Sequence, residues 1–116
     1  MKVQSITICL RVSDLARSVE WYRTALDLDE PDLEPAEGVV EFKVGAVWLQ
    51  LVSGDLPVPG AAVVRLGVPD VAAERARLRA SGIAVGPLEQ VEGVLEYFEF
   101  PDPDGNLLGL YAEVEP

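Results

Sequence analysis

The chain has 116 residues, of which 49% are hydrophobic and 25% charged, as expected for one folded domain with its own core. Twenty acidic and nine basic residues give a formal net charge of −11, which argues against binding nucleic acid or a membrane surface and suits cationic partners. The absence of histidine excludes Ser-His-Asp and Cys-His catalytic systems and any histidine metal ligand. The lone Cys9 cannot form an internal disulfide or a cysteine-based zinc site.

The first half of the chain predicts a strand, a helix and a hairpin. Residues 5–12 alternate in polarity, so Thr7, Cys9 and Arg11 share one face of a strand. A helix is expected from Asp14, a helix-capping residue, to about residue 26. The acidic loop 27–38 could hold a further short strand at 31–38. Strands at 39–44 and 46–52 follow, joined at Gly45.

The second half repeats this order after a linker rich in glycine and proline. A strand is expected at 61–68, followed by a helix from about 70 to 81 that ends at Gly82. Strands at 94–100 and 107–112 flank a turn at 101–106, and residues 83–92 could hold one more short strand.

The two halves superpose with nearly constant shifts in residue number. A shift of 56 places VSDL at 12–15 on VPDV at 68–71, and a shift of 59 places Gln50 on Gly109. The order predicts an α+β fold of two tandem βαβββ-type modules, about 1–54 and 61–116, joined by a linker at 55–60. Together they would form a curved mixed sheet with helices outside and an inner cleft.

The strand faces turned away from the helices would line this cleft, which is where small ligands bind. Trp48 and Tyr111 could stack on a ligand ring or pack as core aromatics, and Tyr97 is a similar candidate. Gln50 could orient a ligand or be an ordinary satisfied amide.

Two arginines are expected on the same faces. Arg11 and Arg65 could bind a carboxylate or phosphate of a ligand, or pair with Glu41 and Glu99 within the protein. The negative net charge of the chain would repel an anionic ligand, so both alternatives remain open.

Three segments resemble the vicinal oxygen chelate superfamily, which includes glyoxalase I, bleomycin resistance proteins and extradiol dioxygenases. They are LRVSDLARSVEWY at 10–22, VPDV at 68–71 with ASG at 80–82, and FPDPDGNLLGL at 100–110. The resemblance covers nearly the whole chain in the right order. It implies paired βαββ(β) modules around an open cleft, commonly in homodimers.

The resemblance also implies where a metal ion would bind. Metal-dependent members use His, Glu or Gln at positions that match Thr7, Gln50, Val63 and Gly109. Only Gln50 is a plausible ligand, whereas a first-row divalent ion needs three or four good donors. We therefore expect neither a metal nor another cofactor. This argues against glyoxalase-type isomerisation, extradiol ring cleavage and metal-dependent thiol transfer to fosfomycin.

The leading hypothesis is a metal-free cytoplasmic protein that binds or sequesters a small cationic or aromatic ligand. One alternative is a metal-independent isomerase or lyase that uses Glu41 or Glu99 as a base, so whether the chain is an enzyme stays open. Another is a structural or regulatory module whose cleft is filled by its own side chains. The predicted ligand-binding residues are Thr7, Arg11, Trp48, Gln50, Arg65, Tyr97, Glu99 and Tyr111.

Overall fold

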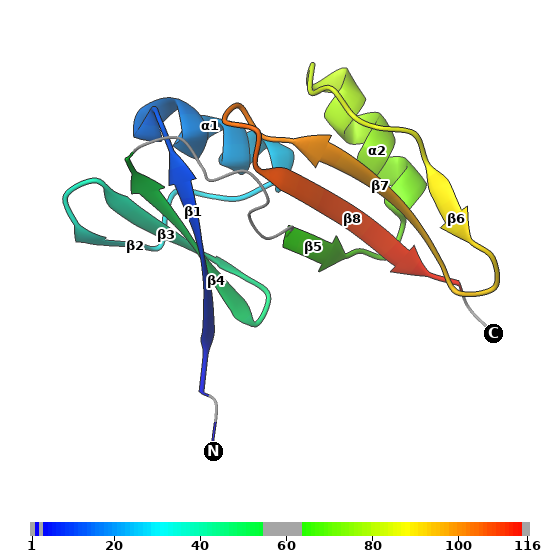
Figure 1. Cartoon of the computed structure of the whole chain (residues 1–116), viewed down its shortest axis with the longest axis horizontal. Helices are drawn as coiled ribbons and strands as arrows, with labels where there is room; N and C mark the ends of the chain where they lie inside the picture. Colours follow the sequence, from blue (N-terminus) through cyan, green and yellow to red (C-terminus); the bar gives the residue numbers. More distant parts are fainter. Residues whose placement is uncertain (1, 3, 55–63, 115–116) are drawn as a thin grey trace. The chain divides into compact units, whose positions relative to one another are not determined.

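The computed structural model describes residues 2, 4–54 and 64–114 and divides into two compact units, Met1–Pro59 and Gly60–Pro116. Each unit carries one helix and one four-stranded sheet (Figure 1). Neither helix is long and apolar enough to cross a membrane, within the residues described.

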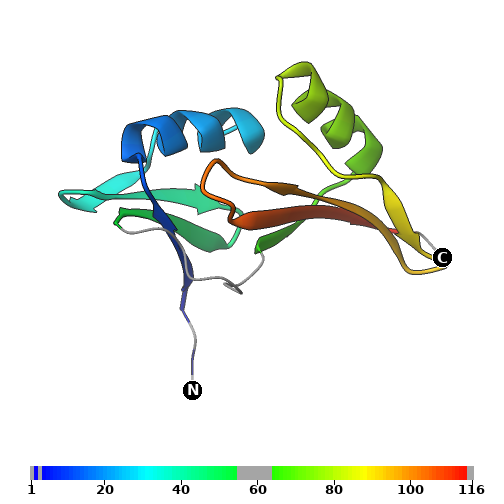
Figure 2. The same cartoon turned by 45° about the horizontal axis from the view of Figure 1, so that its top comes forward.

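The first unit has a mixed sheet covered by one helix. Its elements are β1 (Ile6–Val12), α1 (Leu15–Ala25), β2 (Leu33–Ala36), β3 (Val39–Val44) and β4 (Val47–Ser53). The strand order is β1-β4-β3-β2, in which β1 and β4 run parallel and the other neighbours antiparallel. Figure 2 shows α1 on one side of this sheet.

The second unit repeats this plan with its own helix and strands. They are β5 (Val64–Gly67), α2 (Val71–Ala80), β6 (Glu89–Val91), β7 (Leu95–Pro101) and β8 (Leu107–Glu113). The order β5-β8-β7-β6, with β5 parallel to β8, matches the first sheet strand for strand. The prediction of two βαβββ modules in an α+β fold is therefore confirmed.

The short strands left open by the sequence are present in both units. β2 lies within the segment 31–38 and β6 within 83–92. The expected linker 55–60 and residues 61–63 of the expected strand 61–68 lie outside the described residues.

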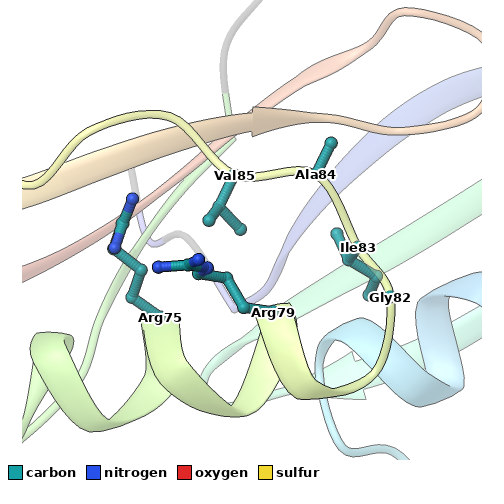
Figure 3. Close-up of a pocket in the computed structure, with 6 residues that line it drawn as sticks. All are labelled: Arg75, Arg79, Gly82, Ile83, Ala84 and Val85. Atoms are coloured by element: carbon teal, nitrogen blue, oxygen red, sulfur yellow. The ribbon is translucent and has the colours of Figure 1, made fainter.

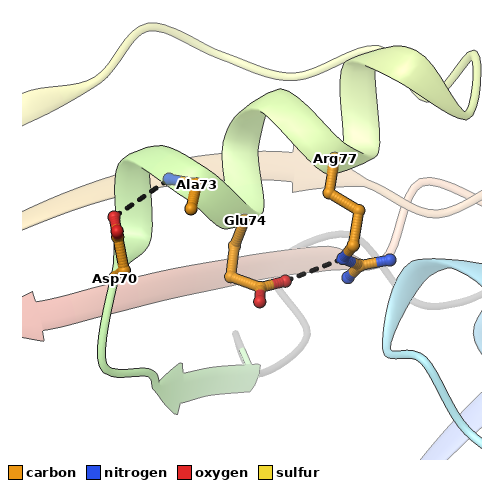
Figure 4. A network of polar contacts seen from close by, with 4 residues as sticks. All are labelled: Asp70, Ala73, Glu74 and Arg77. Carbon is orange, nitrogen blue, oxygen red and sulfur yellow. Dashed lines mark hydrogen bonds and ion pairs between the residues drawn. The ribbon is translucent and has the colours of Figure 1, made fainter.

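Both helices begin with the same cap at equivalent positions. The side chain of Asp14 accepts a hydrogen bond from the backbone of Arg17 at 3.1 Å, and Asp70 accepts from Ala73 at 3.0 Å (Figure 4). Each bond satisfies a first-turn amide that has no partner within its helix. Asp14 and Asp70 are separated by the shift of 56 that the sequence indicated.

The strand register preserves the repeat as well. Cys9 on β1 lies opposite Gln50 on β4, and Arg65 on β5 lies opposite Gly109 on β8. These pairs are related by shifts of 56 and 59, the values found from the sequence pattern. The repeat therefore includes the strand register: equivalent residues lie opposite each other in both sheets.

The helix-facing sides of the sheets form a buried core in each unit, as strand alternation predicts. The buried hydrophobic residues of the first unit are Leu10, Val12, Tyr22, Ala25, Val40, Phe42, Leu49 and Leu51. Those of the second unit are Val64, Val71, Leu78, Phe98, Phe100, Leu108 and Leu110.

Leu15, Val19, Tyr22 and Leu26 recur at helical spacing and are expected to form the buried stripe of α1, but the observed stripe is different. Ser18, Tyr22 and Ala25 are buried, so two small residues let the helix approach the sheet while the tyrosine ring fills the space between them. Leu15 and Val19 are only half-buried and line a surface pocket of about 620 Å³. Apolar spacing thus predicted the helix but not its rotation.

The tight turn between β7 and β8 is built around a buried carboxylate. Asp102 Oδ1 accepts from the backbone N–H of Asn106 at 2.8 Å, and Oδ2 accepts from Asn106 Nδ2 at 2.7 Å. Both side chains are buried, so each satisfies the other's polar group. The expected turn at 101–106 is confirmed.

Candidate functional site

Each sheet has a face turned away from its helix, which we call the first and the second open face. Side chains alternate along a strand, so these faces carry the residues that the helices do not cover. The first open face carries Thr7, Cys9 and Arg11 of β1, Glu41 and Lys43 of β3, and Trp48, Gln50 and Val52 of β4. The second carries Arg65 and Gly67 of β5, Glu89 of β6, Tyr97 and Glu99 of β7, and Gly109 and Tyr111 of β8.

A polar row crosses the middle of the first open face. Cys9, Gln50 and Glu41 lie side by side on β1, β4 and β3. Gln50 Nε2 donates a hydrogen bond to Glu41 Oε2 at 3.0 Å, in a half-buried setting. The bond orders the amide group and leaves its carbonyl oxygen as a further hydrogen-bond acceptor. Cys9 is exposed beside this pair.

An aromatic row lies next to it. Thr7, Trp48 and Lys43 are neighbours across the same three strands. Lys43 Nζ lies 5.2 Å from the centroid of the Trp48 ring, a cation–π distance. Trp48 was predicted as a flat wall for a ligand ring. In the structure the ammonium group of Lys43 lies over this indole ring, so a side chain of the protein itself already uses part of that surface.

On the second open face an ion pair spans three strands. Arg65, Gly109 and Glu99 lie in one row, and Arg65 Nη2 is 3.3 Å from Glu99 Oε2. A Cβ atom at Gly109 would meet Arg65 Nη1 at 3.5 Å and its Cγ at 3.6 Å. The arginine side chain therefore lies flat across the glycine to reach the glutamate. Arg65 is 54% and Glu99 34% exposed, so both stay accessible to a ligand.

A row of tyrosines lies beside the ion pair. Tyr111 faces Gly67 on one side and Tyr97 on the other. A Cβ atom at Gly67 would lie 3.1 Å from both Cζ and Oη of Tyr111, so the phenol ring covers this glycine. The lack of a side chain at Gly67 and at Gly109 lets a long neighbour lie flat on the sheet.

Tyr97 completes this row through a hydrogen bond at the sheet edge. Its hydroxyl donates to Glu89 Oε2 at 2.7 Å. The hydrogen bond to Glu89 and that residue's negative charge raise the pKa of the Tyr97 phenol above its ordinary value. Next to Tyr111 lies a pocket of about 370 Å³, lined by Gly67, Val68, Pro69, Tyr111 and Glu113.

The predicted site residues fall into two groups, one on each unit. The structure places Thr7, Arg11, Trp48 and Gln50 on the first open face, and Arg65, Tyr97, Glu99 and Tyr111 on the second. Of the two pairings considered for the arginines, Arg65 with Glu99 is present.

Sequence reasoning missed three residues of these faces. Lys43 lies two positions after Glu41 on β3, and strand alternation alone would have placed it on the first open face. Glu89 lies on a strand whose position was not fixed by the sequence. The role of Gly67 depends on the neighbouring Tyr111, which only the strand register reveals.

The four positions of the family's metal site do not supply a suitable donor set. Thr7 has a weakly coordinating hydroxyl, Gln50 offers one amide oxygen, and Gly109 has no side chain. Val63 lies outside the described residues, and its side chain is a hydrocarbon. Across residues 2, 4–54 and 64–114, no three Cys, Asp or Glu side chains are grouped so as to hold a metal ion.

Comparison with protein families gives one match that spans most of the chain. The model of the Glyoxalase/Bleomycin resistance protein/Dioxygenase superfamily matches residues 4–110. No curated protein is significantly similar to the chain.

Solved structures with this fold include proteins of different activities. TnmS3, an antibiotic binding protein from Streptomyces sp. CB03234, has a TM-score of 0.82 and 26% identity, over 98% of this chain and 99% of that one. A lactoylglutathione lyase from Agrobacterium tumefaciens has a TM-score of 0.76 and 22% identity, over 92% and 91%. The fosfomycin resistance protein FosX from Listeria monocytogenes, complexed with Mn(II) and sulfate, has 0.79 and 19%, over 98% and 92%.

Proposed function

The chain belongs to the glyoxalase/bleomycin resistance protein/dioxygenase superfamily, and we propose that it binds or sequesters a small cationic or aromatic molecule on its open faces. The observation that carries this proposal is the row of Gly67, Tyr111 and Tyr97 beside the pair of Arg65 and Glu99. It combines flat aromatic surface with accessible charge. The similarity to TnmS3, an antibiotic binding protein, supports this reading.

Aromatic and acidic side chains give these faces a preference for cations. Tyr97 and Tyr111 present neighbouring phenol rings, and Glu89 and Glu99 add negative charge beside them. Aromatic faces and carboxylates together stabilise organic cations, each contributing about 1 kcal/mol where the site is partly exposed. On the first open face, a ligand cation would replace Lys43 over the Trp48 ring.

On each open face, considered by itself, polar side chains would then orient a bound ligand. The carbonyl of Gln50 is free to accept from a ligand donor, because the bond to Glu41 uses the amide nitrogen. Arg65 is held by Glu99 and can offer its remaining N–H groups to a ligand acceptor. Thr7 and Arg11, at either end of β1, belong to the proposed binding set.

We further propose that binding requires no metal. The donor chemistry at Thr7, Gln50 and Gly109 supports this, since a glycine and a weakly coordinating hydroxyl cannot replace carboxylate or imidazole ligands. Sequestration needs affinity alone and does not need a group that lowers a reaction barrier.

The test is calorimetric titration of the purified chain with metal-free bleomycin and a panel of cationic and planar aromatic antibiotics, with and without a chelator. We expect saturable binding that the chelator leaves unchanged. Glu99→Gln should weaken binding of a cationic antibiotic by about tenfold, the loss of one charge-assisted contact. The absence of binding heat across the panel, or binding that the chelator abolishes, would refute the proposal.

A metal-independent isomerase or lyase is the alternative function for the same faces. Its candidate bases, Glu41 and Glu99, are already engaged by Gln50 and Arg65, an arrangement that suits orientation better than proton abstraction. Turnover that survives chelation and is lost in Glu99→Gln would favour the enzyme over a binding protein. The other alternative, a structural or regulatory module, predicts that no ligand of the panel binds.

The proposal includes assembly as a homodimer in the cytoplasm. Family membership supports the dimer, and the single cysteine fits a reducing compartment. Sedimentation equilibrium would give twice the chain mass of 12.5 kDa for a dimer and the chain mass itself for a monomer.

A further inference from the structure

A cavity of about 500 Å³ lies between α2 and the segment that follows it (Figure 3). It is lined by Arg75, Arg79, Gly82, Ile83, Ala84 and Val85. The volume falls within the range of small-molecule sites, and the pocket opens broadly to solvent, with Arg79 exposed and Arg75 half-buried. The lining contains two arginines and no acidic residue, in a chain whose acids outnumber its bases twenty to nine.

The two arginines carry like charges on one face of α2. Arg75 and Arg79 are four residues apart on α2 and share one face of the helix. Figure 3 shows Arg79 bent toward Arg75 beneath Val85. Like charges at this spacing destabilise a helix, and no carboxylate of residues 64–114 pairs with either arginine. Arg77, by contrast, pairs with Glu74 at 2.9 Å (Figure 4).

Arg75 is held in position by the backbone. Its Nε donates to the carbonyl of Gly86 at 2.8 Å, and the Gly86 N–H donates to the Glu99 carbonyl on β7 at 2.7 Å. A Cβ atom at Gly86 would lie 2.8 Å from that same oxygen, so only glycine fits here. The bond through Nε leaves the two terminal NH₂ groups of Arg75 for another acceptor. Such prior ordering lowers the entropy cost of binding.

The remaining wall of the cavity is apolar. Ile83, Ala84 and Val85 follow the helix without regular structure, and Ile83 is tied to α2 by its N–H bond to the Leu78 carbonyl at 3.0 Å. A ligand that satisfies both walls has an anionic group for the guanidinium pair and a hydrocarbon body for these side chains. The net charge of −11 opposes an anion at this site only weakly, because salt screens exposed charges that lie more than about 8 Å away.

We propose that this cavity is a second binding site, which takes a small organic carboxylate with an apolar body. The site lies on the helix side of the second sheet, whereas the second open face is on the other side. The proposed second site therefore does not depend on whether a ligand binds to the open faces.

The test is an NMR titration of the isotope-labelled full chain with benzoate, with benzamide as the neutral isostere and with inorganic phosphate. We expect benzoate to shift the Nε–H signals of Arg75 and Arg79 and the amide signals of 83–85 in a saturable way. Arg79→Gln should weaken benzoate binding by at least about tenfold, the effect of losing one charge-assisted contact. Arg75→Gln should do the same.

Arg77→Gln is the matched control, because Arg77 lies on the same helix and is paired with Glu74. It should leave benzoate binding unchanged. Three results would overturn the site: no saturable shift with benzoate, equal shifts with benzamide, or unchanged benzoate affinity in Arg79→Gln. Phosphate binding as tight as benzoate binding would overturn the assignment to an organic carboxylate, because the apolar wall would then contribute nothing.

Discussion

At the scale of single residues, two glycines determine the orientation of the large side chains on the second open face. Gly67 and Gly109 leave room on the sheet surface, and Tyr111 and Arg65 occupy it. The ring and the guanidinium are thereby presented flat to solvent, which is the orientation a stacked ligand needs.

Gly67→Ala should disturb this arrangement without unfolding the chain. The new methyl group would lie 3.1 Å from the Tyr111 ring, closer than normal packing allows, so the ring must tilt away from the sheet. We expect ligand affinity to fall several-fold, on the order of 1 kcal/mol. Gly54→Ala is the matched control, because a Cβ atom there meets nothing within 4 Å. Unchanged affinity in Gly67→Ala would show that the Tyr111 ring does not contact the ligand.

Tyr97 gives the same face a measurable pH signature. Its pKa is raised above 10.0, first by the hydrogen bond to Glu89 and then by the charge of that carboxylate. The folded pKa exceeds the unfolded value, so the contribution to stability is complete below pH about 10 and is lost as the pH rises through the folded pKa. Glu89→Gln should return the Tyr97 pKa toward its ordinary value, as measured by NMR of labelled tyrosine. A Tyr97 titration that is identical in Glu89→Gln would contradict the hydrogen bond.

At the scale of elements, a close backbone contact joins the segment after α2 to the second sheet. Gly86 donates to the Glu99 carbonyl on β7, and its own carbonyl accepts from Arg75. A Cβ atom at this position would approach the Glu99 oxygen to 2.8 Å. The backbone of the segment and of β7 would have to separate to admit it.

Gly86→Ala should therefore destabilise the fold by about 1–3 kcal/mol, the typical cost of overpacking. Chemical denaturation of this variant and of Gly54→Ala would measure the difference in unfolding free energy. Equal stability of the two would show that the segment can move aside at little cost.

Much of each element could be predicted from the sequence, because local rules determine it. The alternation of polar and apolar residues predicted which residues of β1 and β4 share a face. The capping aspartates predicted where both helices begin. The rotation of α1 could not be predicted, since it depends on how Ser18 and Ala25 pack against the sheet. The contacts of Tyr111 with Gly67 and of Arg65 with Glu99 depend on register between strands distant in sequence.

At the scale of the whole molecule, one small unit occurs twice and its equivalent rows carry different chemistry. The row of Cys9, Gln50 and Glu41 corresponds to that of Arg65, Gly109 and Glu99. Only the glutamate is common to both rows. The scaffold has thus kept its hydrogen-bonded framework while the side chains on its open faces diverged, as expected when function resides in the site and not in the fold.

The chain contains two tryptophans, and only Trp48 lies on an open face, because Trp21 belongs to α1 and contacts Tyr22 edge-on at 4.9 Å. The most direct test of ligand binding on the first open face is a fluorescence titration of Trp21→Phe, in which Trp48 is the only fluorescent indole. With the ligand found by calorimetry, and with chelator present, we expect saturable quenching in Trp21→Phe and none in Trp48→Phe. Quenching confined to Trp48→Phe, or none in either variant, would contradict a binding role for the first open face.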